Sequence, residues 1–595
     1  MKFLSLEKKI EISFYTIIIF FTFYTYTFFA IISKNYNFLF TVITIFLYII
    51  FHKIYSKNNL KISFKILNIE ILSIFLLLII GLILNFQDLK FSLEGDEFST
   101  ALRTQRTSIY SSFIFLKLID IEILKKINFN KVVYLFSFIE IIFLTIVAYL
   151  ISKKKNLYLI ALLILFTLLF RIYLKDFGMH PPVNHLSSFI ITSIFGFTDY
   201  GFRFSYLLIY VFGNIVLLYQ LNRIFKNRIL NLLIILFLFT IPISLLSSTN
   251  VDHNSWGYVF LLNFLFYFYF NKKLNYEMIV LFITIFSMAR ITNFILILPL
   301  FYIYFLENKK NFQIKKFLLT FLPVIFFLPF VLKLILLGSN VHSSGVSTIY
   351  LGIAESLKDN SFLKSAIFFV PNYIFVFSFL GFLLFIFKEK INNRGFAIIL
   401  TFFIYLIIYS SISSQWIGHP KYIFEFIMPF LVLFLIIFSK FNTKIMPIIL
   451  ITLIFFNILN IKKFKSIVYV NEIENKKFQI RHRFDYKAAF RSIKNKNLNL
   501  SNYHFGVYYG FVTEILNDFK FNELVVVNNR NLEVKGQIYK KVDLKLFFEI
   551  NDNIESVLVT ESDYTLHKNI FKDWRIIDKF YYEEYKHNKL IHLMK

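Results

Sequence analysis

The chain of 595 residues contains no cysteine. This absence excludes disulfides, thiol nucleophiles, and zinc or iron–sulfur sites built on cysteine. Acidic residues are scarce too, with 36 Asp and Glu against 64 Lys and Arg and a formal net charge of +28. Most of the lysine lies in short loops between apolar runs, a pattern that indicates membrane topology rather than a nucleic-acid surface. We therefore expect no nucleic-acid partner.

Apolar residues, in contrast, are abundant. They make up 57% of the chain, 20% is aromatic, and the mean hydropathy is +0.65. A soluble domain does not carry that share, so we expect a polytopic α-helical membrane protein with about 13 to 15 transmembrane helices. The basic loops fall on one side, which the positive-inside rule makes the cytoplasm; they are 53–65, 153–155, 223–228, 272–273, 309–316, 388–394 and 440–444.

This assignment of the basic loops to the cytoplasm predicts a multi-pass protein of the bacterial inner membrane with a cytoplasmic N-terminus. The membrane domain is expected over residues 1–461. Residues 462–595 are more polar, with strand-like runs at 503–508, 523–527 and 556–560 and helical patterns between them. Strands alternating with helices predict a small α/β domain with a partly parallel sheet. The alternation of sides along the predicted spans puts this domain in the periplasm.

An acidic segment in the first long outer loop is the first candidate for a site. Asp96 and Glu97 follow a long apolar run, and carboxylates beside a bilayer are costly to desolvate. If a helix begins at Asp96, then Ser99, Thr100 and Arg103 share its face. The alternative is an acidic helix start that complements the helix dipole.

Two further polar segments lie on the same predicted face. Consecutive prolines, in a chain with only ten, fix an extended loop that would hold Asp176 and His180 at the membrane edge, unless they merely stop a helix. Asp252 and His253 are side chains of the kinds that orient substrates or bind cations. The same pair also suits a polar helix cap.

Two basic positions complete the set. Arg290 lies between short apolar runs, where a guanidinium needs either a protein carboxylate or an anionic ligand such as a phosphate. Further on, His419 and Lys421 are donors ahead of Pro429, which is expected to kink the following helix. Lys421 alternatively extends its side chain to the membrane interface.

Together these segments resemble the GT-C membrane glycosyltransferases, in particular the protein O-mannosyltransferase and lipid A aminoarabinose transferase group. The resemblance covers roughly residues 67–595 and rests on an ordered set of short segments. In order, these are Gly95-Asp-Glu-Phe-Ser-Thr-Ala, His180-Pro-Pro, Phe195-Gly-Phe-Thr-Asp-Tyr-Gly-Phe-Arg203, the Asp252 loop, Arg290 and His419-Pro-Lys-Tyr422.

The resemblance implies transfer of a sugar from a polyprenyl-phosphate donor to a lipid, glycan or protein acceptor, with inversion, at the outer face of the membrane. It makes Asp96 the general base, supported by Glu97, with Arg290 and Lys421 on the phosphate. Two predicted spans, near 132–151 and 157–174, separate Asp96 from His180-Pro-Pro, whereas typical members have both in one outer loop. Asp176, just before His180-Pro-Pro, is therefore a rival for the role of base. The remaining substrate-binding candidates are Arg103, His180, Asp252, His253, His419 and Tyr422.

No cofactor is required by this interpretation, and a divalent cation is admitted without being needed, because basic side chains can neutralise the phosphate. Two other classes stay open. A transporter or flippase of a lipid-linked or anionic substrate would favour ionisable groups near the midplane and internal repeats. A non-catalytic scaffold would use its polar domain to bind a partner.

Overall fold

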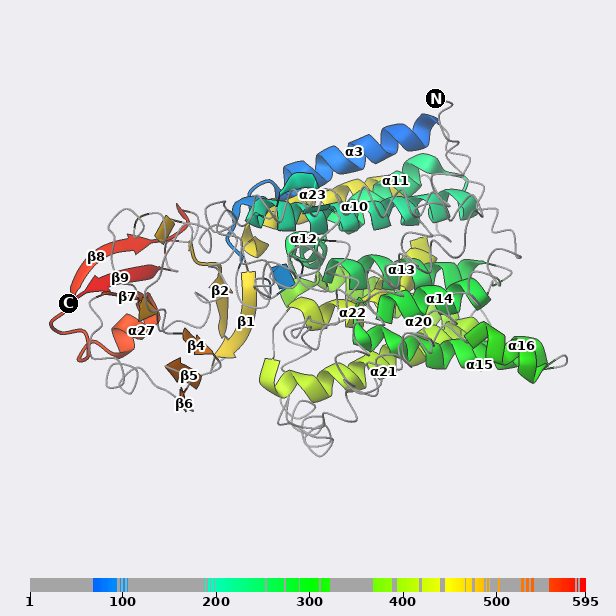
Figure 1. The fold of residues 1–595 in the computed structure, drawn as a ribbon. Coiled ribbons are helices and arrows are strands. Elements are labelled where there is room, and N and C mark those ends of the chain that lie inside the picture. Colours follow the sequence, from blue (N-terminus) through cyan, green and yellow to red (C-terminus); the bar gives the residue numbers. More distant parts are fainter. Residues whose placement is uncertain are drawn as a thin grey trace, which may run out of the picture.

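The computed structural model describes residues 68–93, single positions between 97 and 104, 188–321, 368–387, 393–416, 420–438, 445–492, 501–502, 526–539 and 556–595, with short gaps inside several of these ranges. Every described strand follows Phe464, and the described chain before it is mainly helical. Figure 1 shows most of the helices running alongside one another on one side of the molecule and the strands gathered on the other.

The helical part packs around one apolar core, to which α10, α11, α13 and α22 contribute, with Leu207, Phe237, Leu265 and Phe434 among its buried side chains. Its elements are α3 (Asn68–Asn85), η1 (Asp88–Lys90), α10 (Asp199–Ile224), α11 (Arg228–Thr240), α12 (Pro242–Thr249), α13 (Asn254–Phe270), α14 (Tyr276–Ser287), η2 (Ile291–Leu296), α15 (Ile297–Asn308), α16 (Ile314–Phe321), α20 (Asn372–Phe387), α21 (Asn393–Trp416), α22 (Pro420–Phe438, with Pro429 inside it) and α23 (Met446–Phe464).

The start of α10 is fixed by its local sequence. The hydroxyl of Thr198 caps the helix by accepting from the Gly201 N–H at 3.1 Å. Gly196 adopts a φ of +98°, which favours glycine. A Cβ on Gly201 would lie 2.0 Å from the Gly196 carbonyl oxygen, so the turn can fold back onto the helix only because Gly201 has no side chain. These contacts set the position of Arg203, in the first turns of α10.

Few of the described helices are long and apolar enough to cross a membrane. By length and composition α10 is long and apolar enough, and α11 with α12 forms a second such segment if the pair is counted as one span despite its 72° bend. Proline at the first position of α12 accounts for the bend, since it cannot continue α11. The polytopic architecture therefore stays a prediction.

Several helices nevertheless expose apolar side chains along one face. On α3, Phe75, Ile79 and Ile83 are 59%, 52% and 68% exposed and recur every four residues, which places them on one stripe. On α23, Ile448 and Phe455 are exposed in the same way, while the opposite side of that helix packs on α11.

The C-terminal part begins with an antiparallel hairpin of β1 (Ile467–Ile473) and β2 (Lys477–His482). A seven-stranded mixed sheet follows, in the order β6-β5-β4-β3-β7-β9-β8. Its strand β3 is parallel to β4 and β7, and the other pairs are antiparallel. The elements are β3 (Ser501–Asn502), β4 (Val526–Asn528), β5 (Asn531–Val534), β6 (Gln537–Tyr539), β7 (Ser556–Thr560), α27 (Glu561–Leu566), β8 (Arg575–Phe580) and β9 (Leu590–Met594).

The predicted strand at 556–560 coincides with β7, and the one at 523–527 overlaps β4. The predicted strand at 503–508 lies outside the described residues. The sequence pattern does not predict β1, β2, β8 or β9. Polar or charged side chains interrupt the apolar pattern of β1 (Asn471 and Glu472), β2 and β8, while β9 is a short, largely buried run between two strands.

Candidate functional site

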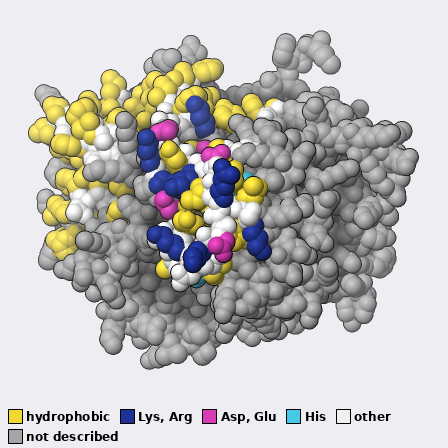
Figure 2. All heavy atoms as spheres, turned by 90° about the vertical axis from the view of Figure 1, so that its left-hand side faces the viewer, with side chains coloured by type: hydrophobic (Ala, Val, Ile, Leu, Met, Phe, Trp, Pro, Cys, Tyr) yellow, Lys and Arg dark blue, Asp and Glu magenta, His cyan; other side chains and the backbone are white. Residues whose placement is uncertain are grey.

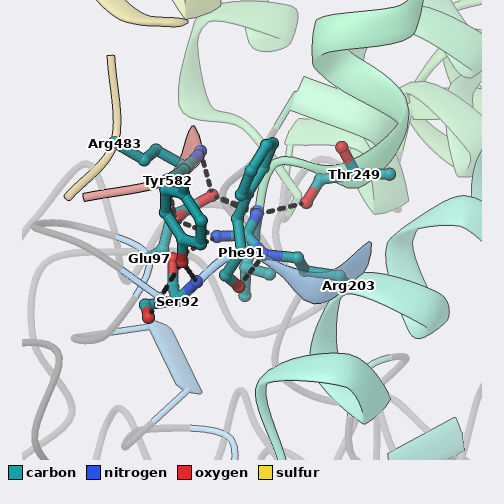
Figure 3. A network of polar contacts seen from close by, with 8 residues as sticks. Phe91, Ser92, Glu97, Arg203, Thr249, Arg483 and Tyr582 are labelled. Atoms are coloured by element: carbon teal, nitrogen blue, oxygen red, sulfur yellow. Dashed lines mark hydrogen bonds and ion pairs between the residues drawn. The ribbon is translucent and has the colours of Figure 1, made fainter. Parts of the chain in front are cut away.

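A buried carboxylate, Glu97, lies at the centre of a polar cluster that joins the helical part to the C-terminal part (Figure 3). Arg203 donates from Nη1 to Oε1 at 3.0 Å and from Nη2 to Oε2 at 2.9 Å. Arg483 donates from Nη2 to Oε1 at 2.8 Å, and its Nη1 pairs with Oε2. The Val251 N–H also donates to Oε1, at 3.1 Å. Both carboxylate oxygens are thus held by several donors.

Arg203 connects this carboxylate to three backbone carbonyls. Its side chain is 1% exposed, and Nε donates to the Phe91 carbonyl at 2.8 Å. Nη2 donates to the Ser92 carbonyl at 2.7 Å, and Nη1 to the Thr249 carbonyl at 2.9 Å. A buried guanidinium is tolerated when its donors are satisfied in this way. Arg203 therefore ties the segment after α3 to the end of α12.

Tyr582, two residues beyond the end of β8, adds a second link from the C-terminal part. Its hydroxyl accepts from the Ser92 N–H at 3.0 Å and lies 3.3 Å from the Ser92 Oγ. Its ring meets Phe91 edge-on, with centroids 4.8 Å apart. Burial and the charge of Asp485 raise the pKa of the Tyr582 hydroxyl, so the group remains neutral near pH 7.

The charge on Glu97 follows from its neighbours. Burial alone would raise the pKa of Glu97, but the charges and hydrogen bonds of Arg203 and Arg483 outweigh burial and hold it below its ordinary value of 4.5. A carboxylate whose oxygens are already shared among five donors is a poor proton acceptor. Its arrangement suits an anchor for the segment that also contains Asp96.

A second buried charge pair lies in the helical part. Arg290 occupies the break between α14 and η2, and its guanidinium pairs with Glu425 of α22; their side chains are 7% and 0% exposed. Close by, the Tyr405 hydroxyl donates to Asn293 Oδ1 at 3.1 Å. Of the two expectations for Arg290, a protein carboxylate or an anionic ligand, the structure supplies the carboxylate.

Removing one partner of this pair is expected to be more damaging than removing both. Glu425→Gln and Arg290→Met should each lower the free energy of unfolding by about 3 to 5 kcal/mol, since each leaves a buried charge unbalanced. The double variant Arg290→Met/Glu425→Leu should lose clearly less than the sum. Thermal unfolding in detergent measures all three. Lys586→Ala, which breaks an exposed pair, is the control, and additive losses would contradict the coupling.

The predicted site residues are described to different extents. Glu97 and Arg290 are described with their side chains, whereas for Lys421 and Tyr422 the structure describes only the backbone, in the first turn of α22. The others lie outside the described residues: Asp96, Arg103, Asp176, His180, Asp252, His253 and His419.

Chain connectivity still brings two of these residues to the Glu97 cluster. Asp96 is the chain neighbour of Glu97, and Asp252 is the chain neighbour of Val251, and Glu97 and Val251 are hydrogen-bonded in the cluster. The acidic segment and the Asp252 loop therefore approach one another, as a shared site requires. Whether the side chains of Asp96 and Asp252 converge stays a prediction.

Sequence reasoning gives Arg203, Glu425, Arg483 and Tyr582 no role. A signal existed for Arg203, because an arginine inside an apolar 26-residue helix needs a partner. The same argument applies to Glu425 in α22. No comparable signal marks Arg483, which lies in a basic stretch of a polar region, or Tyr582, which is one of several neighbouring tyrosines.

In the described part of the chain, no three His, Asp or Glu side chains are grouped so as to hold a metal ion. A divalent cation, which the sequence admits without requiring, stays untested, because Asp252 and His253 lie outside the described residues. Comparison of the chain with protein-family models, curated proteins and solved structures gave no match.

Proposed function

We propose that the protein is an integral-membrane glycosyltransferase. It transfers a sugar from a polyprenyl-phosphate donor to a lipid, glycan or protein acceptor at the outer face of the membrane. The observation that carries the proposal is the Glu97 cluster. Glu97 contacts Arg203, 106 residues away, and Val251, 154 residues away. Three of the segments on which the resemblance rests thereby meet at one place.

Membrane embedding is supported by the surface of the helical part. The apolar stripes on α3 and α23 would be unfavourable in water but suit contact with lipid. Charged side chains of both signs, in contrast, gather on the face of the C-terminal part seen in Figure 2. An apolar helical surface beside a charged domain fits a donor with a polyprenyl tail and a phosphate head.

The proposed reaction is a single displacement. The acceptor hydroxyl attacks the anomeric carbon while Asp96 takes its proton; the new C–O bond forms as the bond to the phosphate oxygen breaks, and the configuration inverts. Glu97 does not act as the base, since Arg203 and Arg483 hold it as an anchor. Lys421 stabilises the leaving phosphate. Arg290, which the sequence also assigns to the phosphate, has its charge balanced by Glu425.

One observation favours the competing transporter. Transporters bind substrates where helices are broken, and α14 is broken from η2 at the residue that forms the Arg290–Glu425 pair. The 72° bend between α11 and α12 is a second interruption. A transporter would carry the lipid-linked donor across the membrane without breaking the glycosidic bond.

Membranes containing the full chain, supplied with radiolabelled polyprenyl-phosphate sugar, distinguish these functions. We expect the label to appear in a lipid, glycan or protein fraction, and matched membranes without the chain to show none. Movement of intact donor between leaflets without transfer would favour the transporter. Neither transfer nor movement, across the three acceptor fractions, would contradict both.

A further inference from the structure

The C-terminal part contacts the acidic segment through two separate groups. Arg483 directly follows β2 and is 6% exposed, with its guanidinium on both oxygens of Glu97. Tyr582 follows β8 and holds Ser92 and Phe91. These residues come from different strands, β2 in the hairpin and β8 at the edge of the larger sheet. Two independent elements thus reach the same short segment.

These contacts hold both ends of the segment that contains Asp96. At one end, the Ser92 N–H is bound by Tyr582 and its carbonyl by Arg203. At the other end, Glu97 is bound by Arg203 and Arg483. Arg203 belongs to the helical part and Arg483 and Tyr582 to the C-terminal part, so each end has one anchor from each part.

We infer that Arg483 and Tyr582 are positioning residues, through which the C-terminal part holds the segment of the candidate base Asp96 in the position required for catalysis. The inference rests on the proposed function and deepens it: the C-terminal part belongs to the catalytic machinery and does not merely cover the site. A misplacement of a base by about 1 Å can cost a hundredfold in rate. Loss of either anchor therefore lowers kcat, while binding of the donor, governed by basic residues elsewhere, is unchanged.

The absence of cysteine allows the anchoring to be measured without any assay of activity. Ser92 is 1% exposed, so a single Ser92→Cys should react slowly with a maleimide in full-length protein in membranes. Adding Arg483→Ala or Tyr582→Ala should speed labelling by about tenfold, because the segment opens more often. Adding Lys586→Ala, in an exposed pair of the same part, should not. Equal labelling rates in all four proteins would overturn the inference.

Transfer kinetics then test the catalytic consequence with milder changes. Tyr582→Phe removes only the hydroxyl, and Arg483→Lys keeps the charge but loses the two-pronged contact. Both should lower kcat by about tenfold or more with KM for the donor within about twofold of the wild type. Rates equal to those of Lys586→Ala would overturn the positioning role. If the wild type transfers no sugar, the proposed function fails, whereas the labelling rates still decide the anchoring.

Discussion

Arg203→Ala is expected to yield the least stable single variant of the Glu97 cluster. The change removes five hydrogen bonds, two to Glu97 and one each to the carbonyls of Phe91, Ser92 and Thr249. Loss of one partner of a buried ion pair costs about 3 to 5 kcal/mol. That is a large part of a total stability of about 5 to 15 kcal/mol.

Thermal unfolding of the detergent-purified protein measures the effect. Arg203→Lys should unfold between the wild type and Arg203→Ala, because an ammonium keeps the charge but cannot reproduce the planar fork of donors. Arg223→Ala is the matched control, since Arg223 lies in the last turn of the same helix and stacks over Tyr219. If Arg203→Ala unfolded at the same temperature as Arg223→Ala, the central role of Arg203 would be wrong.

Local sequence patterns explain how much of the fold could be predicted. The strand at 556–560 has a clear apolar run between polar flanks, and the structure has β7 there. The break between α14 and η2 falls where the sequence places Arg290 between two short apolar runs. Hydropathy could not identify Glu425 of α22, 135 residues later in the chain, as the buried partner of Arg290. Such long-range pairing leaves no periodic signal.

In the candidate site, too, the local sequence predicted the charged residues but not their partners. Composition and charge indicated that Glu97 and Arg290 were costly in an apolar setting and needed partners. The sequence could not identify those partners, because a carboxylate such as Glu97 can be satisfied by any of 64 basic residues. Arg483 lies 386 residues from Glu97, and only the packing of the C-terminal part brings the two together. We propose that the supporting role predicted for Glu97 takes the form of an anchor.

Asp96→Asn is expected to have the largest effect on the reaction itself. An amide is nearly the same size as the carboxylate but cannot accept the proton of the acceptor hydroxyl, so transfer should fall by about a hundred- to ten-thousandfold. Stability should change little, because the amide keeps the size of the carboxylate and the contacts of Glu97 stay in place. Glu97→Gln should lower the unfolding temperature as well as transfer, because two buried guanidinium groups lose their anion and the anchor beside Asp96 is weakened.

Asp176 provides the internal comparison. It directly precedes the predicted His180 loop and is the rival base, so Asp176→Asn distinguishes the two assignments in the same assay. We expect Asp176→Asn to retain transfer within about threefold of the wild type, because the proposed reaction takes the proton with Asp96. A profound loss in Asp176→Asn together with full activity in Asp96→Asn would transfer the catalytic role to Asp176.

The most direct test is the rate of sugar transfer from labelled polyprenyl phosphate by wild-type, Asp96→Asn and Asp176→Asn proteins, at equal amounts in matched membranes. The proposed function predicts transfer by the wild type, at least a hundredfold less by a correctly folded Asp96→Asn protein, and near-normal transfer by Asp176→Asn. Undiminished transfer by Asp96→Asn, or none by the wild type, would contradict it.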